Sequence, residues 1–374
     1  MVKEKEFQWP KRFYVIAWKG VGVEITKAWG SLLAKDKGMR LVVAPEVNSV
    51  NRFKWLGLRF FHITAGGTTE TSQMIEADRK YSARYTGPFP VRAVWAQSLS
   101  HSGYFVRSYS KIKSLYYIKP GTRFADMSHY VANVRIVEAF LAWAKVNTKD
   151  IDWVRGDSYK ENVASVLEGR ADVCFGIPTS PTVFDAEKHP IGIRWIDMNS
   201  SEDPEGAARF RAIDPLIDFG PMFNGVPSSI GRWGTVGTSL YLTHRDTDTR
   251  MVYGIARWMN DNYPRIKASH SWGTWMNMET LMDELERTFI PVHEGLVQLL
   301  KETGKWTANL EKRNQANIAL IDRYCQAFQD CKDNADDKEV VIDPENPEWE
   351  KMWEGYKKEL GLPKIVMIPK DVKV

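Results

Sequence analysis

The chain has 374 residues, of which 43% are hydrophobic and 26% are charged, and these ordinary proportions exclude a collagen-like or wholly disordered protein. Its 51 basic and 47 acidic residues give a formal net charge of +4. The basic residues are scattered along the sequence rather than gathered in a stripe, so we expect no nucleic-acid partner.

The first third of the chain alternates strand and helix patterns. Residues 13–18 form an apolar, β-prone run, and a glycine-containing turn at 19–22 leads into a helix with apolar residues at helical spacing. Residues 41–44 predict a second strand, after which Asn48 and Ser49 can cap a second helix. This alternation favours an α/β fold.

A third strand is predicted over residues 59–64, followed by a loop of small residues at 65–69 that would let a ligand approach the backbone. Further strands are expected at 91–97 and 104–108. Strands that alternate with helices predict a mainly parallel sheet, in which ligands lie at the carboxyl ends of the strands.

A second unit is predicted to start near Ser108. Its expected elements are helices over 134–146 and 158–170, the latter opened by the capping box of Ser158 and Glu161, and strands over 171–177 and 194–198. Residues 199–232 are rich in loop-forming residues, and the β-prone run 234–243 then returns the chain to its first unit. The tail begins with a long polar helix over 309–330, after which prolines interrupt the pattern.

No stretch approaches the ~18 apolar residues that span a bilayer, and residues 1–12 contain no apolar signal core. If the protein is exported, its signal peptide has already been removed from this sequence.

The three cysteines form no disulfide framework. Cys174 lies in a predicted buried strand. Cys325 and Cys331 would be ~9 Å apart along a continuous helix, so a disulfide between them requires the helix to end between the two residues. The sequence leaves this alternative open.

Motifs for enzymatic chemistry are incomplete. The turn at 19–22 lacks the third glycine of a dinucleotide fingerprint, and no two histidines have the spacing of a helical zinc pair. His293 and Glu294 form only half of such a motif, and no nucleophile stands beside a base. We therefore expect a protein that is not an enzyme and that uses no cofactor or metal.

What remains is a pattern typical of a binding site. The loops at 18–22, 46–51 and 65–68 each follow a strand and precede a helix, so they should lie together along one edge of the sheet as half of a cleft. Helix amino ends carry unpaired N–H donors and partial positive charge, which suits a carboxylate, and Lys19 would add a full charge. Glu24 would oppose an anion.

The candidate ligand contacts have four roles. Trp18 and Phe223 would be apolar walls, Lys19 would hold an anion, Gly66 would allow close approach, and the remaining candidates, which are Asn48, Ser49, Asn51, Thr68, Thr179, Ser180 and Thr235, would form neutral hydrogen bonds. Helix capping is an alternative role for Asn48, Ser49, Asn51, Thr179 and Ser180. Trp18 has core packing as its alternative.

Several segments are similar to the TAXI-type solute receptors of tripartite TRAP transporters, over roughly residues 11–310. The segment 47–51 stands where that family has Gly-Ser-x-x-Asn, and Ser49 and Asn51 look retained as ligand contacts. Residues 158–172 resemble the helix and strand entry of the second lobe, and residues 291–307 resemble a C-terminal signature of one branch. The segment 18–26 departs from the family's Ser/Thr-Gly-Gly-Thr-Tyr-Tyr loop, so we expect a rebuilt first-lobe pocket, with Trp18 and Lys19 where the family has small hydroxyls and a tyrosine.

The resemblance implies an α/β type II periplasmic-binding-protein fold, with two lobes around a ligand cleft, export to the periplasm, no cofactor, and TRAP membrane subunits as partners. We expect lobe I at 11–105 with 240–310, lobe II at 106–239, and a helical C-terminal extension at 311–374. The expected function is capture of a small carboxylate and its delivery to the membrane subunits. An enzyme on the same two-lobed fold, or a protein that senses a ligand or binds a partner through its tail, are the alternatives.

Overall fold

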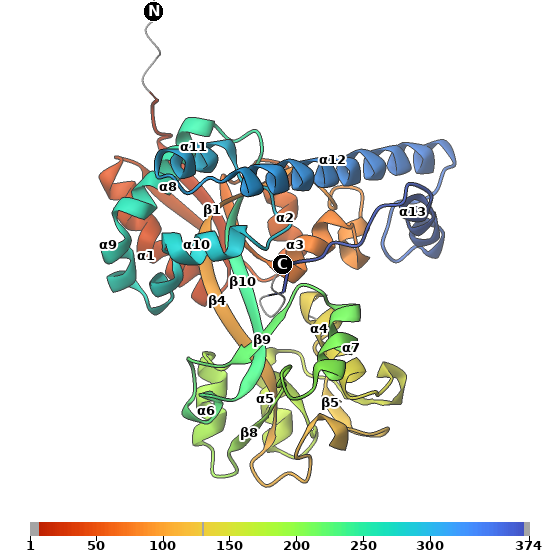
Figure 1. Cartoon of the computed structure of the whole chain (residues 1–374). Coiled ribbons are helices and arrows are strands. Elements are labelled where there is room, and N and C mark those ends of the chain that lie inside the picture. The colour runs from red at the N-terminus through yellow and green to blue at the C-terminus, as the bar shows by residue number, and fades with distance from the viewer. Residues whose placement is uncertain (1–6, 129–130, 370–374) are drawn as a thin grey trace, which may run out of the picture. The chain divides into compact units, whose positions relative to one another are not determined.

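The computed structural model describes residues 7–128 and 131–369. The chain divides into two units (Figure 1): unit 1 takes in residues up to Ser98 and Thr238–Ile365, and unit 2 takes in Leu99–Gly237 and the residues after Ile365. The sequence-based division puts the junctions after residues 105 and 239. In the structure they lie inside two strands, β4 (Val91–Arg107) and β10 (Trp233–His244).

Unit 1 is built on a mixed sheet in the order β2-β1-β3-β10-β4. Strands β1 (Arg12–Trp18), β2 (Arg40–Glu46) and β3 (Ile63–Gly67) are parallel, and β10 runs antiparallel to β3. The register places Trp18 opposite Glu46. The carboxyl ends of the three parallel strands therefore share one edge of the sheet.

Seven α-helices of unit 1 lie in the sequence before its tail. They are α1 (Val21–Asp36), α2 (Ser49–Gly57), α3 (Thr68–Ile75), α8 (Thr249–Asp261), α9 (Tyr263–Ser269), α10 (Met278–Leu285) and α11 (Glu294–Glu302), and the described residues also form the short 3-10 helices Arg79–Ser82 and Ser271–Trp275. Helix α1 buries Ile25, Trp29 and Leu33 along one face, as the helical spacing predicts. The indole Nε1 of Trp29 donates to the Tyr241 hydroxyl on β10 at 2.7 Å, which ties α1 to the sheet.

The tail packs on unit 1. It consists of the long helix α12 (Ala308–Asp337) and the helix α13 (Pro347–Glu359), both visible in blue in Figure 1. Trp349 and Trp353 on α13 are buried, and their indole N–H groups donate to the carbonyls of Ser82 at 2.7 Å and Glu76 at 3.1 Å. The helical part of the C-terminal extension is therefore a folded part of unit 1, whereas residues 366–369 belong to unit 2.

Unit 2 has its own strands and helices. Near the unit 2 ends of β4 and β10 lie β7 (Cys174–Gly176), β8 (Ile193–Ile196) and β9 (Asp218–Pro221), and a separate two-stranded parallel sheet contains β5 (Arg123–Ala125) and β6 (Asp152–Val154). The helices are α4 (Val131–Trp143), α5 (Tyr159–Leu167), α6 (Pro181–Lys188) and α7 (Pro204–Ile213), with 3-10 turns at Leu115–Tyr117, Thr148–Asp150 and Pro227–Ser229. At the centre of its core, the rings of Tyr104 and Phe140 stack with centroids 3.5 Å apart.

The predicted α/β class with two lobes and a helical extension is confirmed, and four details are corrected. The two strands expected at 91–97 and 104–108 are one continuous strand, β4. Strand β3 begins later than predicted, because Arg59 has a left-handed φ of 62° that a strand cannot contain. The sheets are mixed rather than mainly parallel, and the region 199–232 contains α7 and β9.

Helix α12 passes without a break through Cys325 and Cys331, and both are free thiols. The geometric condition for a disulfide, a helix end between them, is therefore not met. Within the described ranges, no helix combines the length and the apolar composition that crossing a bilayer requires.

Candidate functional site

The carboxyl edge of β1, β2 and β3 gathers three loops of unit 1. The Lys19 N–H donates to the Glu46 carbonyl at 3.3 Å, which joins the loop after β1 to the loop after β2. Each loop leads directly into a helix, α1, α2 or α3. The clustering expected from the sequence is thus present, and it brings Trp18, Lys19 and the candidates of residues 48–51 to one edge.

The amino end of α1 lacks a capping side chain. Its N-cap, Gly20, has a φ of 90° that favours glycine, and it has no side chain to cap the helix. The N–H groups of Val23 and Glu24 bond back to the Gly20 carbonyl. Lys19 is exposed and forms no ion pair with any residue that the structure describes. Positive charge and helix N–H groups therefore lie side by side here.

Trp18 packs between the start of α1 and a buried arginine. A Cβ atom on Gly22 would lie 2.7 Å from Trp18 Cβ, so only glycine allows this contact. The Arg52 guanidinium lies 4.9 Å from the centroid of the Trp18 ring, within the range of a cation–π interaction. Trp18 is half-buried, so it has both a packing role and an exposed part.

The amino end of α2 is already occupied by polar groups of the chain. Asn48 caps the helix, since its Oδ1 accepts the Val50 N–H at 2.8 Å. The Glu46 carboxylate accepts the Asn48 N–H at 2.8 Å and the Asn51 side-chain N–H at 3.4 Å. Ser49 Oγ accepts the hydroxyl proton of Tyr81 at 2.7 Å. The capping interpretation holds for Asn48, and a carboxylate of the chain lies where an anionic ligand would bind.

The start of α3 is held by a buried ion pair. Glu70 accepts the Gly67 N–H at 2.9 Å and the Arg52 guanidinium at 2.7 Å, and Arg52 also donates to the Ala65 carbonyl at 2.5 Å. The side chains of this pair are 1% and 9% exposed. Among the three helix starts, α1 is the one at which no carboxylate of the described residues accepts an N–H group, although Glu24 lies in its first turn.

Gly66 and Thr68 are buried in unit 1. A Cβ atom on Gly66 would lie 2.6 Å from Leu242 and 2.9 Å from Phe53, so packing within the unit accounts for this glycine. Thr68 is 3% exposed. The close approach of a ligand expected at this loop remains a prediction.

Four of the predicted ligand contacts lie in unit 2. They are Thr179, Ser180, Phe223 and Thr235. Ser180 is the N-cap of α6, but its side chain makes no capping bond, and Thr179 beside it is half-buried. The Val226 N–H donates to the Pro178 carbonyl at 3.0 Å, which places the loop containing Phe223 beside this turn. Gly225, with a φ of 112°, permits the close approach to Pro178.

Phe223 and Thr235 lead to a residue that the sequence did not single out, His101. The rings of His101 and Phe223 meet edge to face with centroids 4.2 Å apart, and Phe223 remains 46% exposed. Thr235 Oγ1 lies 2.5 Å from the hydroxyl of Ser102, the next residue of β4. Desolvation lowers the pKa of His101 to about 4, against a smaller raising effect of the Thr235 backbone. The sequence around His101 could not predict this site, because its neighbours Phe223 and Thr235 come from distant segments of the chain.

A hollow of about 410 Å³ lies elsewhere in unit 1, lined by residues of the N-terminal segment such as Trp9, by Lys37 at the carboxyl end of α1, and by residues of α8 such as Arg257. Its arginines already have carboxylate partners: Arg250 pairs with Asp248 at 2.8 Å and Arg257 with Asp261 at 3.1 Å. It lies away from the carboxyl edge of the strands, so we do not favour it as the main site. In the described ranges, no three His, Cys, Asp or Glu side chains are grouped so that they could hold a metal ion.

The structure is that of a two-lobed α/β protein with polar loops along one strand edge of unit 1. The sequence comparison names the family. Residues 17–304 match the model of the NMT1-like family. The chain therefore belongs to the NMT1-like family.

The chain is also similar to solved periplasmic binding proteins. The periplasmic aliphatic sulphonate binding protein SsuA of Escherichia coli is 12% identical over 87% of this chain and 88% of its own, with a TM-score of 0.44. The alkanesulfonate-binding protein SsuA of Xanthomonas axonopodis pv. citri, solved with MOPS, is 12% identical over 90% and 96%, with a TM-score of 0.40. The periplasmic VFT2 domain of Bordetella pertussis BvgS is 10% identical over 70% and 94%, with a TM-score of 0.39. No curated protein matches the sequence.

Proposed function

We propose that this protein is a solute-binding receptor, not an enzyme, and that its site lies at the carboxyl edge of β1, β2 and β3. The observation that carries this proposal is the amino end of α1, which has no side-chain cap and where the exposed Lys19 and the half-buried Trp18 come together. Such an end attracts negative charge, and an aromatic wall beside it suits an organic molecule.

The proposed solute is a small carboxylate. Its carboxyl group would lie at the start of α1 beside Lys19, because Glu46 and Glu70 already accept the amide protons of Asn48 and Gly67. A negative group placed at α2 or α3 would meet these carboxylates at close range and be repelled. This refines the sequence-based prediction, which spread the anion contact over all three helix starts.

In unit 1, neutral hydrogen bonds would come from Ser49 and Asn51. Both retain unused capacity, since the Ser49 hydroxyl can still donate and Asn51 keeps its side-chain oxygen. In unit 2, the Ser180 side chain makes no capping bond, so its hydroxyl is proposed as a ligand contact of that unit, together with Thr179 beside it and with Phe223 as an apolar surface.

We further propose the biological setting that the TAXI-like segments imply. In this setting the protein acts in the periplasm, uses no cofactor, and delivers its solute to TRAP membrane subunits. Co-purification of the intact chain with such subunits, strengthened by the solute, is the result we expect.

Thermal unfolding in the presence of small carboxylates and their matched amides tests the proposed solute class. A ligand that binds only the folded chain adds about 2.7 kcal/mol at 100 times its dissociation constant, which raises the unfolding midpoint measurably. We expect a saturable shift with at least one carboxylate and none with its amide. Lys19→Gln should weaken binding about tenfold or more through loss of a charge-assisted bond, whereas Lys27→Gln on the exposed side of α1 should not. Absence of any shift across the set would argue against the receptor function.

The partner-binding alternative depends on the tail. Trp349 and Trp353 are buried against unit 1 rather than offered to a partner, which favours a structural role for α13. Removal of the tail would then destabilise the chain instead of selectively abolishing an interaction. For the enzyme alternative, turnover of any solute found in the screen is the deciding observation.

A further inference from the structure

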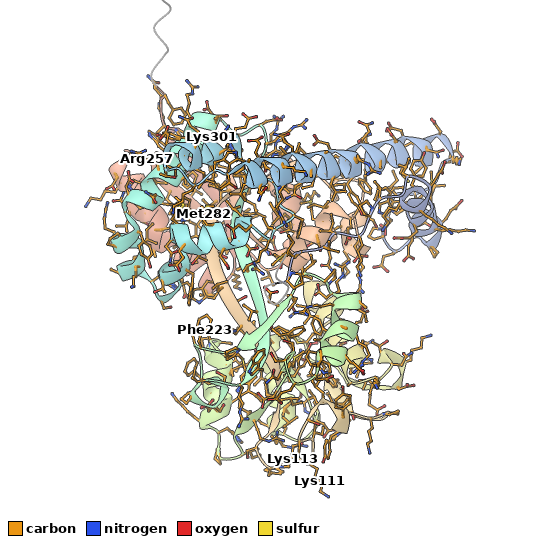
Figure 2. The ribbon with its side chains drawn as sticks, viewed as in Figure 1. Lys111, Lys113, Phe223, Arg257, Met282 and Lys301 are labelled. Carbon is orange, nitrogen blue, oxygen red and sulfur yellow. The ribbon has the colours of Figure 1, made fainter. Side chains whose placement is uncertain are left out.

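The loop that follows β4 in unit 2 is basic, aromatic and free of acidic residues. No Asp or Glu occurs between Arg107 and Asp126, whereas lysines stand at 111, 113 and 119. All three lysines are exposed. Figure 2 shows Lys111 and Lys113 close together at one end of unit 2. Basic residues are scattered over the chain as a whole, but these three lysines lie within the single segment 111–119.

This loop is held in a defined conformation. The Arg194 guanidinium on β8 donates to the carbonyls of Ser110 at 3.3 Å and Ile112 at 2.6 Å, and Ile112 packs against the core of the unit. The two lysines flank this anchored isoleucine. Since successive residues of an extended segment point in opposite directions, the inward Ile112 sets Lys111 and Lys113 outward, and little conformational entropy of the backbone remains to be lost on binding.

Two carboxylates of unit 2 are already paired with arginines, whereas Asp150 and Asp152 lie beside the end of the loop, where the Gly121 N–H donates to the Asp150 carbonyl at 2.7 Å and the Asp152 N–H to the Thr122 carbonyl at 3.1 Å. Asp172 is bound by Arg107 at 3.2 Å and by Arg123 at 2.6 Å, and Asp197 by Arg232 at 2.9 Å. The three lysines have no ion pair with any residue in the described ranges. Their positive charges are therefore available to a negatively charged partner.

Exposed tyrosine rings accompany the lysines. Tyr109, Tyr116 and Tyr117 are 67%, 47% and 55% exposed. The Tyr109 ring lies 6.0 Å from the Arg107 guanidinium, and the Tyr116 hydroxyl donates to Asp203 at 2.5 Å, so two of the rings have fixed partners. Tyrosine and lysine together are typical of side chains that lie at the boundary between water and lipid.

We infer that this loop, defined by residues 108–121, docks on a membrane surface that carries anionic lipid headgroups. A lipid surface is favoured because exposed lysines and tyrosines stand together at one end of the unit (Figure 2), in a loop that contains no acidic residue. Lysines supply attraction to the headgroups, and tyrosine rings insert among them.

Co-sedimentation of the intact chain with vesicles tests the inference. Vesicles of phosphatidylcholine mixed with phosphatidylglycerol should bind the protein at low salt, and pure phosphatidylcholine vesicles should not. Each lysine near an anionic surface contributes about fivefold in affinity, so Lys111→Gln, Lys113→Gln and Lys119→Gln combined should weaken binding by about 100-fold. High salt should abolish binding in the same way.

A matched variant separates this loop from the effect of net charge. Lys27→Gln, Lys35→Gln and Lys160→Gln change the charge of the chain by the same amount at exposed positions outside the loop. This variant should bind as the wild type does. Equal losses of vesicle binding in the two triple variants would overturn the inference. A wild-type chain that does not bind anionic vesicles at low salt would overturn it as well, and would leave an acidic protein as the partner for the loop.

Discussion

At the scale of single residues, the candidate site depends on charges that the fold has buried in pairs. Arg52 and Glu70 lie on different helices, and their side chains are 1% and 9% exposed. The Arg52 guanidinium also packs against the face of the Trp18 ring. A buried charge without its partner is costly, whereas a fully paired one can be neutral for stability. The pair therefore fixes the positions of α2, α3 and Trp18 relative to one another.

Replacing Arg52 with Met should destabilise the chain by about 3–5 kcal/mol, because Glu70 is left buried without its cation. The double variant Arg52→Met, Glu70→Gln should recover part of this loss. Urea unfolding of the two variants beside the wild type measures both effects. Equal stability of Arg52→Met and wild type would contradict the account of the pair.

His101 should make stability depend on pH. Its pKa is lowered from 6.5 to about 4 by desolvation, so between these two values the unfolded chain binds the proton and the folded chain does not. The contribution of His101 to the free energy of unfolding is therefore fully present above pH 6.5. It is lost as the pH falls toward 4, by roughly 3 kcal/mol in total.

The measurement is urea unfolding at several pH values for the wild type and for His101→Asn. The variant should lose less stability than the wild type as the pH falls from 7 toward 4, because the other histidines with lowered pKa values are common to both chains. Parallel curves for the two chains would show that His101 is not buried in its neutral form.

At the scale of elements, the sequence predicted well where one segment decides the structure by itself. The apolar run of β1 and the helical spacing in α1 do not depend on distant partners, and both were predicted nearly to their ends. The polar residues Ser98, Ser100 and Ser102 broke the hydrophobic pattern of β4, so its continuity was missed. Two of these hydroxyls have partners on β10: Ser100 Oγ donates to the Gly237 carbonyl at 3.2 Å, and Ser102 Oγ lies 2.5 Å from Thr235 Oγ1. No local pattern reveals such partners.

The same limit applies to the candidate site. The three loops at the strand edge follow from strand and helix alternation, but the pairing of Arg52 with Glu70 depends on a contact between two helices. The Glu46 carboxylate accepts the N–H of Asn48, only two residues away, yet residue types alone do not specify that bond. Sequence reasoning therefore proposed the edge as the site without distinguishing among its helix starts, and this site remains a prediction.

The tail offers a test at this scale. Trp353 on α13 is 2% exposed and packs edge to face on Phe328 of α12 with ring centroids 5.1 Å apart. Truncation of a buried Trp to Ala costs about 3–5 kcal/mol, so Trp353→Ala should lower the free energy of unfolding of the intact chain by this amount. Lys351→Ala, at an exposed position of the same helix, should have little effect. A Trp353→Ala chain as stable as the control would mean that the tail does not support unit 1.

At the scale of the whole molecule, the chain consists of two α/β units with a tail that belongs to unit 1, and it belongs to the NMT1-like family. Length and alternation of strands and helices were sufficient to predict two lobes. The exact junctions were not predictable, because they lie inside the strands β4 and β10, where the local pattern does not change.

The most direct test of the account is hydrogen–deuterium exchange of the intact chain, measured with and without a pooled set of small organic carboxylates. The account predicts slower exchange at the backbone amides of residues 18–22, at the open start of α1, with smaller effects at 46–51. Protection confined to residues 250–262, which line the hollow beside α8, or no protection anywhere in the chain, would contradict it.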